Sequence, residues 1–289
     1  MRIREGFPGQ RLRVLPADVV RAASAGGPTS RLLVTDAGWF PRALHHGRAR
    51  RAGASGTVVI VCAAGRGWCR AGAGTVAVGP GQALVVPAGL PHAYGAEDSD
   101  PWTIAWLHAT GPDAREFERT LTGGGPRAVV VDLHDVVAVL GEVERVVEHL
   151  ETDETAPTLV RASGAAWNVL AGVAADALAG SPVHREPVRR VQQHLRAHLE
   201  APVSVTALAA MTGLSASHFA ALFHAATGGG VVEYAKRLRM ARACELLITT
   251  SLPVGEIARS VGYADAFYFS RQFRSVHGCS PSAFRSREQ

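Results

Sequence analysis

The chain has few cysteines for its size. Four occur among 289 residues, and they are widely spaced: Cys62, Cys69, Cys244 and Cys279. A small disulfide-stapled scaffold needs a denser framework, so we expect these thiols to stay reduced. Cys62 and Cys69 also lack a second pair of ligands at zinc-finger spacing, which argues against a structural zinc site.

Long hydrophobic runs are missing as well. The longest, Thr57–Ala64, falls far below the roughly 18 residues that a membrane-spanning helix needs, and Met1–Gly6 lacks the apolar core of a signal peptide. We therefore expect a cytoplasmic protein with no membrane partner. Hydrophobic residues make up 47% of the chain and charged residues 19%, which is typical of folded domains, and the length suggests about two of them.

An excess of one charge is absent from most of the chain but present at its end. Residues 1–180 carry 17 basic and 18 acidic side chains, whereas residues 181–289 carry 13 basic and 7 acidic ones. A basic last third indicates a polyanionic partner such as nucleic acid. A solvated basic face with no partner would have the same composition and is the alternative.

The pattern of apolar residues changes along the chain. Short apolar runs in residues 30–110 alternate with Gly- and Pro-rich turns, a spacing typical of a β-sandwich or barrel. Apolar residues at helical spacing follow in Leu133–Leu150 and in about Pro157–Leu178, and Gly180-Ser-Pro182 then breaks the chain. The expected organisation is a β domain at 1–126, a helical dimerisation or linker region at 127–182, and an all-α domain at 183–289.

The last third contains an internal repeat with a period of 49–50 residues. Leu208–Leu214 aligns with Ile257–Tyr263. With one residue inserted, the later positions also match: Phe219 with Phe269, Phe223 with Phe273, Gly228 with Gly278, and Tyr234 with Phe284. Each copy has the pattern of a helix, a glycine turn and a second helix, which is typical of a helix-turn-helix unit. Two such matches in a basic region favour DNA binding over a plain helical bundle.

A long amphipathic stretch, Val232–Ile248, joins the two copies. A rigid helix at this place would fix the spacing of the units. If each unit enters the major groove, the pair would contact two segments about one helical turn apart on one face of the DNA.

The repeat resembles the DNA-binding domain of the AraC/XylS family of bacterial transcription regulators. The resemblance is carried by Leu208-Ala209, Gly213-Leu-Ser215, Phe223, Gly228, Tyr234, Arg237-Leu238, Ala241, Leu246-Leu247, Ile257-Ala258, Val261-Gly262-Tyr263, Tyr268–Phe273, Gly278 and Ser280-Pro281. It implies seven helices, with recognition helices at about 215–226 and 264–276. The family usually has a proline near Val231, where this chain has Gly229-Gly230, so we expect a looser start to the linking helix.

The N-terminal part resembles the sugar-responsive members of the same family. Gly81–His92 fits the second cupin motif, except that Ala96 stands at its final Asn position, and Trp102–His108 follows. The resemblance implies an α+β protein in which a cupin-like β-barrel and a few helices precede an all-α domain with two helix-turn-helix units.

The candidate ligand residues are polar or aromatic side chains close to these motifs: Arg48, Arg50, His92, Tyr94, Trp102 and Trp106. Arginine and histidine can hydrogen-bond sugar hydroxyls, and aromatic rings stack on sugar C–H faces. By alignment with the arabinose-type members, Arg50, Tyr94 and Trp106 occupy sugar-contacting positions, whereas Ile104 replaces a contacting histidine. We therefore expect a sugar or another small polar ligand other than arabinose. Core packing is the alternative for Trp102 and Trp106.

The candidate DNA contacts lie on the two recognition helices. The second unit offers Asp265, Tyr268, Arg271, Gln272 and Arg274, and the first offers Ser215, Ser217, His218 and His224. Arginine can donate two hydrogen bonds to guanine and glutamine can pair with adenine, while Arg274 suits a phosphate equally well. Because Ala220 and Ala221 have no polar side-chain atoms, the first helix has fewer groups that could contact bases than the second.

A metal-dependent cupin enzyme with an appended helical domain is the alternative function. Such enzymes need two histidines separated by one residue and a following glutamate. This chain has the adjacent pair His45-His46, whose side chains would point to opposite faces of a strand, and no glutamate follows. We therefore expect no metal, no cofactor and no catalytic residues.

The residues thus predict a ligand-responsive regulator that binds double-stranded promoter DNA and a sugar-like effector. The resemblance also implies a homodimer and a contact with RNA polymerase. An apolar stripe motivates the dimer: Val136, Leu140, Val143, Val147 and Leu150. Packing of this stripe on the β-barrel of its own chain is the alternative.

Overall fold

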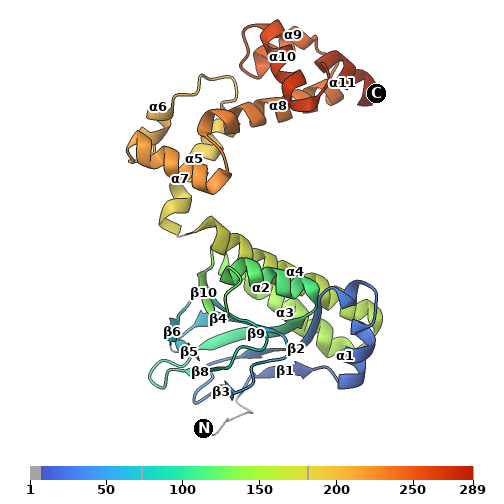
Figure 1. The fold of residues 1–289 in the computed structure, drawn as a ribbon, viewed down its shortest axis with the longest axis vertical. Coiled ribbons are helices and arrows are strands. Elements are labelled where there is room, and N and C mark those ends of the chain that lie inside the picture. Colours follow the sequence, from blue (N-terminus) through green and yellow to red (C-terminus); the bar gives the residue numbers. More distant parts are fainter. Residues whose placement is uncertain (1–7, 73, 181, 289) are drawn as a thin grey trace. The chain divides into compact units, whose positions relative to one another are not determined.

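The computed structural model describes residues 8–72, 74–180 and 182–288. The chain divides into two compact units, Met1–Gly180 and Ser181–Gln289. Figure 1 shows that the first unit contains all the strands together with helices and that the second is entirely helical. The α+β class is therefore confirmed. No helix in the described ranges combines the length and the apolar character needed to cross a membrane.

The N-terminal unit contains two antiparallel sheets. The larger has the strand order β1 (Arg11–Val14), β2 (Leu33–Phe40), β9 (Thr103–Thr110), β4 (Thr57–Ala64), β7 (Gln82–Val86) and β10 (Val129–Asp132). The smaller has the order β3 (Gly47–Arg50), β8 (His92–Ala96), β5 (Gly67–Ala71) and β6 (Gly74–Val78). Strands β2 to β9 lie within residues 30–110, where the spacing of apolar runs and turns predicts short strands, whereas β1 and β10 lie outside that range and were not predicted.

Strand β4 shows why the central strands are apolar throughout. Val58 and Ile60 lie in the core between the two sheets, whereas Val59 and Val61 lie in a second core under the helices. Both faces of the strand are therefore buried. A strand covered on both sides loses the alternation of polar and apolar residues and becomes a continuous apolar run.

Helices cover the outer face of the larger sheet (Figure 1). They are α2 (Pro112–Thr122), α3 (Val136–Thr152) and α4 (Ala156–Ala179), with α1 (Ala17–Ser24) and the 3-10 turn η1 (Pro28–Ser30) at the edge. The predicted apolar stripe on α3 belongs to this core: Val143, Val147 and Leu150 are buried, and Val136 and Leu140 pack against them. The stripe thus packs on the sheet of its own chain, which is the alternative to a dimer contact.

The C-terminal unit consists of two small cores around one long helix. Its helices are α5 (Pro182–Ala197), α6 (Val205–Ala210), α7 (Ala216–Thr227), α8 (Val231–Thr249), α9 (Val254–Ser260), α10 (Ala266–His277) and α11 (Pro281–Glu288). Phe219 and Phe223 of α7 are buried in the first core, and Phe269 and Phe273 of α10 are buried at the matching positions of the second. The internal repeat is therefore a structural repeat.

Candidate functional site

The two recognition helices begin in the same way. The Ser215 hydroxyl accepts a hydrogen bond from the His218 backbone N–H, and the Asp265 carboxylate accepts from the backbone N–H groups of Phe267 and Tyr268. These caps satisfy donors that a helix start leaves unpaired. Ser215 and Asp265, both predicted DNA contacts, therefore have a structural task at the helix N-termini.

The turn before each recognition helix requires glycine. Gly213 and Gly262 have φ angles of 72° and 83°, in the left-handed region that side chains disfavour. At Gly262 a Cβ would also lie 2.8 Å from the Leu199 carbonyl oxygen. The turn thus holds α10 close to the loop that follows α5.

The second recognition helix, α10, presents an aromatic and basic surface. Tyr268, Arg271 and Arg274 are exposed as predicted, and the Arg271 guanidinium lies 5.9 Å from the centre of the Tyr268 ring. Gln272 is half-buried at the edge of this surface. The most exposed aromatic side chain on this helix is Phe267, 84% of whose surface is accessible to solvent. Phe267 was not predicted as a DNA contact, because a phenylalanine in a helix is ordinarily expected to lie in the core.

The first recognition helix, α7, presents a smaller surface. Ser217, His218 and His224 are exposed as predicted, and Ala221 is exposed between them. No lysine or arginine lies within Ala216–Thr227. Ala220 and Ala221 predict that the first unit has fewer side chains able to contact bases. The structure agrees, because the exposed side chains of α7 are small and none carries a permanent positive charge.

Arginine 239 joins the two halves of the helical unit. Its guanidinium donates to the carbonyl oxygens of Leu199 and Ala201, each at 2.7 Å, and lies 5.6 Å from the centre of the Tyr263 ring. Three contacts from one side chain connect α8, the loop after α5 and the turn before α10. Arg239 is thus a structural group that holds the turn before α10 against the loop after α5.

A small cavity lies between the two sheets of the N-terminal unit. Its polar and aromatic lining includes Asp36, His46, Arg48, Arg50, Tyr94, Trp106 and His108. Four of the six predicted ligand residues, Arg48, Arg50, Tyr94 and Trp106, are brought together here. The other two lie beside the cavity: the His92 ring stacks on Tyr94 with ring centres 5.8 Å apart, and Trp102 is fully buried in the core.

An acid–histidine pair in the cavity was not predicted. Strands β2 and β9 place Asp36 opposite His108, and the His108 Nδ1–H donates to Asp36 Oδ2 at 2.7 Å. Burial alone would raise the pKa of Asp36, but hydrogen bonds from His108 and Thr35, with the charges of His108 and Arg50, hold that pKa below its usual value. The lone acidic residue in the apolar segment Leu33–Phe40 was the signal in the sequence.

Histidine 46 is neutral in the same cavity. Burial, reinforced by the charge of Arg48, lowers the pKa of His46 to about 4. The neighbouring His45 points away into solvent and pairs with Asp98 at 3.1 Å. The two adjacent histidines therefore face apart, and no cluster of three or more His, Cys, Asp or Glu side chains in the described ranges could hold a metal ion.

Several buried polar atoms at this cavity have no hydrogen-bond partner in the described part of the chain. Those on lining residues are His46 Nδ1, Arg50 Nε, Trp106 Nε1 and His108 Nε2, and those beside it are His92 Nε2 and Trp102 Nε1. Buried polar groups without partners cost roughly 1–3 kcal/mol each. A site with this many is suited to a polar ligand that supplies the missing bonds.

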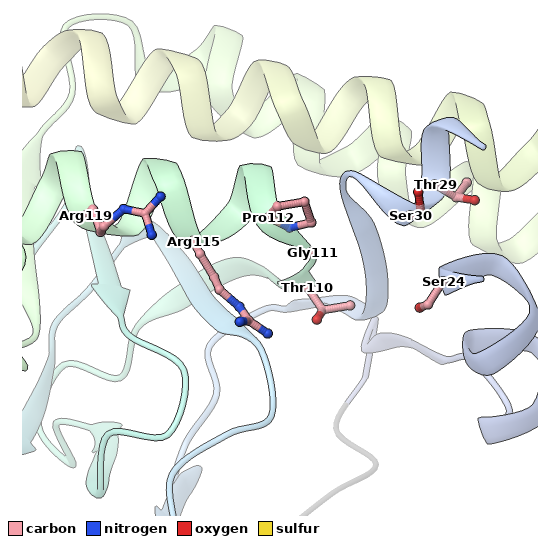
Figure 2. Close-up of a pocket in the computed structure, with 8 residues that line it drawn as sticks. All are labelled: Ser24, Thr29, Ser30, Thr110, Gly111, Pro112, Arg115 and Arg119. Carbon is pink, nitrogen blue, oxygen red and sulfur yellow. The ribbon is translucent and has the colours of Figure 1, made fainter. Parts of the chain in front are cut away.

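A second polar cavity, on the outside of the unit, differs in this respect. Figure 2 shows Arg115 and Arg119 of α2 on one side, the hydroxyl residues Ser24, Thr29 and Ser30 on the other, and the Thr110–Pro112 turn between them. The Thr29 hydroxyl donates to the Ala23 carbonyl, the Ser30 hydroxyl donates to that of Gly27, and Arg119 pairs with Glu116. These groups are satisfied within the protein, so the cavity between the sheets is the better candidate for a ligand.

Comparison with known proteins gives matches to both units. A helix-turn-helix domain family matches residues 208–287, and an AraC-like ligand binding domain family matches residues 40–163. The MmsAB operon regulatory protein of Pseudomonas aeruginosa is 31% identical over 297 residues, which cover 97% of this chain and 92% of that protein.

Two further matches cover about a third of the chain. The arabinose operon regulatory protein of Escherichia coli is 35% identical over 100 residues, 34% of each chain. The C-terminal domain of AraT, a response regulator from Geobacillus stearothermophilus, matches 37% of this chain and 86% of its own at 30% identity, with a TM-score of 0.34. The relatives found by sequence are regulatory proteins, which favours a regulator over an enzyme. Similarity along nearly the whole chain, together with the two domain matches, shows that the protein belongs to the AraC family of DNA-binding transcription regulators and carries an AraC-like ligand-binding domain.

Proposed function

We propose that this regulator binds promoter DNA through α7 and α10 and is controlled by a small polar molecule bound between its two sheets. One observation carries the DNA part: the repeat presents two recognition helices, and Phe267, Tyr268 and Arg271 project from the second. Similarity to the MmsAB operon regulatory protein supports control of an operon. A promoter target also assigns the protein to the cytoplasm, and control of transcription assigns it a contact with RNA polymerase.

The exposed side chains of α10 have chemistry suited to base reading. Arg271 can donate two hydrogen bonds to guanine, Gln272 can pair with adenine, and Phe267 can contact the methyl group of thymine. Arg274, one turn further along the helix, suits a backbone phosphate. On α7 the equivalent groups are the Ser217 hydroxyl and the imidazoles of His218 and His224, which can make hydrogen bonds but add no permanent charge.

We also propose that two copies of the protein form a homodimer through α4. Val160, Trp167 and Leu178 are 39%, 47% and 73% exposed, and their spacing of 7 and 11 residues puts them on one face of the helix. A Cβ built at Gly164, on the same face, would meet nothing within 4 Å. This apolar stripe points outward, unlike the buried stripe of α3, and therefore suits the α4 helix of a second copy.

The DNA part of the proposal is tested by titrating the purified chain against the fragment upstream of its own gene. Phosphate contacts release counterions, so we expect affinity to fall steeply as salt rises from 50 to about 200 mM. A fragment that is bound no better than unrelated DNA at any salt concentration would contradict the proposal.

The dimer is tested by sedimentation of the wild type and of Trp167→Glu. The substitution would bury a charge in the proposed interface and should therefore weaken the dimer.

A further inference from the structure

Two histidines lie side by side at the end of α5. His194 and His198 are four residues apart, a spacing that puts both side chains on one face of a helix. Their ring centres are 4.4 Å apart and their planes differ by 26°. Among the 12 histidines of the chain, only these two have this spacing. Neither the proposed DNA contacts nor the cavity between the sheets accounts for the pair.

A backbone hydrogen bond fixes the role of each ring nitrogen of His198. The Nδ1 atom lies 3.0 Å from the His194 carbonyl oxygen. A carbonyl oxygen only accepts, so Nδ1 is the nitrogen that donates. Nε2 is then the atom on which a metal ion can bind, and the ion displaces any proton held there. A backbone carbonyl that accepts from the other ring nitrogen is the usual support of a metal-binding histidine.

The ring of His194 is also available. In the described part of the chain neither of its ring nitrogens makes a hydrogen bond or an ion pair, because it is the backbone carbonyl of His194 that bonds to His198. The His194 side chain is half-buried and that of His198 is exposed. Arg190, one turn earlier on the same face, lies 3.9 Å from Glu186, which offsets its charge. Both rings can therefore be reached by a cation from solvent.

Two imidazoles at this spacing can chelate one ion. Zinc binds histidine nitrogen at about 2.0–2.1 Å, so two nitrogens on one ion are at most about 4.2 Å apart. The 4.4 Å between the ring centres is close to that limit, and a small rotation of the exposed ring is enough to reach it. Two histidines four apart on a helix are also the pair that holds zinc in helical metal-binding motifs. With two protein ligands, the remaining coordination positions are left to water, so the ion exchanges freely.

We propose that His194 and His198 bind one divalent transition-metal ion, with the preference of imidazole for Cu²⁺, Ni²⁺ and Zn²⁺ over Mg²⁺. This site belongs to the helical unit and is distinct from a cupin metal centre, whose ligands the chain lacks. The inference does not rest on the proposed function.

The bound ion fastens the end of α5 to the loop that follows it. The His198 N–H donates to the His194 carbonyl at 3.1 Å, and the Ala201 N–H donates to the His198 carbonyl at 3.2 Å. In the same loop the carbonyl oxygens of Leu199 and Ala201 accept from Arg239. An ion held by both side chains restricts this turn, so the turn and the loop should open less often when the ion is bound.

The experiment is calorimetric titration of the full chain with Ni²⁺, Cu²⁺ and Mg²⁺ in the absence of DNA. We expect Ni²⁺ to bind, Cu²⁺ to bind more tightly, and Mg²⁺, which prefers oxygen ligands, not to bind at up to about 1 mM. His194→Ala and His198→Ala should each weaken Ni²⁺ binding at least about tenfold, because the second ligand acts at high effective concentration. Neither side chain belongs to the buried core, so both variants should melt as the wild type does without metal.

Two controls separate the pair from histidine in general. His194→Ala combined with Gln193→His keeps the number of histidines but moves one ring about 100° around the helix, and it should bind Ni²⁺ as weakly as His194→Ala alone. His134→Ala removes a solitary exposed histidine and should bind as the wild type does. No Ni²⁺ binding by the wild type, or equally tight binding by His194→Ala or by the shifted variant, would overturn the inference.

Hydrogen exchange tests the effect of the ion on the loop. Saturating Ni²⁺ should slow amide exchange at His198 and Ala201 in the wild type but not in His194→Ala. Unchanged exchange in the Ni²⁺-bound wild type would overturn the fastening of α5. Because promoter binding is measured separately, a chain that binds Ni²⁺ through the pair but ignores its promoter would support this site and contradict the proposed function.

Discussion

The two helix-turn-helix units share a framework and differ in their surfaces. In both, a side-chain cap begins the recognition helix, a glycine turn precedes it, and two phenylalanines anchor it in a core of its own. At the exposed positions, however, Ser217 of α7 corresponds to Phe267 of α10, and Ala221 corresponds to Arg271. The buried residues therefore specify the fold of each unit, and the exposed residues specify what each unit can read.

This difference leads us to assign unequal work to the two units. The second carries aromatic and permanently charged groups and should supply most of the base contacts. The first, with small side chains and two imidazoles, should contribute mainly placement on the DNA and sensitivity to its shape. The following changes break or sharpen this comparison, from the largest expected effect to the smallest.

Removing a core phenylalanine should be equally damaging in either unit. Phe223 and Phe273 are both fully buried, so each alanine substitution should cost about 3–5 kcal/mol of stability. Because the two cores are separate clusters, hydrogen exchange should accelerate first in α7 for Phe223→Ala and in α10 for Phe273→Ala. Phe267→Ala, an exposed phenylalanine in the same helix, is the matched control and should leave exchange unchanged.

The arginine that distinguishes the units should dominate sequence-specific binding. Arg271→Ala should weaken promoter binding by about 1–3 kcal/mol and relax specificity at one base pair. Arg242→Ala removes the same charge from an exposed position on α8, where Arg242 pairs with Glu245 at 2.6 Å, and should have a much smaller effect. Equal losses for the two variants in an anisotropy titration would mean that only overall charge matters.

The exposed phenylalanine should read a thymine methyl group. Burial of one methyl group is worth about 0.8 kcal/mol, so replacing the contacted thymine by uracil should cost about that much in the wild type. The same replacement should cost nothing in Phe267→Ala, and the two changes together should show this coupling in a double-mutant cycle. Ser217→Ala in the first unit should show no such coupling at any thymine.

Loss of a cap should have the smallest effect on DNA reading, because it acts on the stability of the helix start. Asp265→Ala and Ser215→Ala should each cost about 1 kcal/mol of stability. Asp265 accepts from two backbone N–H groups and Ser215 from one, so the loss at Asp265 should be the larger. Thermal denaturation of both variants gives the order, and a larger loss at Ser215 would contradict the account.

The local features of the helical unit could be predicted well from the sequence. The family resemblance implied recognition helices at about 215–226 and 264–276, and the structure has α7 at Ala216–Thr227 and α10 at Ala266–His277. Glycine turns, capping residues and helical spacing are local signals, and in this repeat each of them occurs twice. The missing proline near Val231 did not prevent α8 from beginning there, because Val231 is buried in the first core.

Features that depend on distant neighbours were predicted less well. The stripe on α3 is apolar whether a sheet or a second chain covers it, so periodicity could not distinguish the two. The pairing of Asp36 with His108 requires β2 to lie beside β9, and these strands are about 70 residues apart in the chain. Phe267 was missed because its exposure follows from the packing of Phe269 and Phe273 on the opposite face of α10.

The central claim is that the second unit does most of the reading, and one binding experiment tests it directly. Anisotropy titrations would compare the bound promoter segment with versions in which the bases under one recognition helix are scrambled while those under the other stay intact. We predict that scrambling the segment under α10 weakens binding at least about tenfold more than scrambling the segment under α7. Equal losses, or a greater loss under α7, would contradict the account.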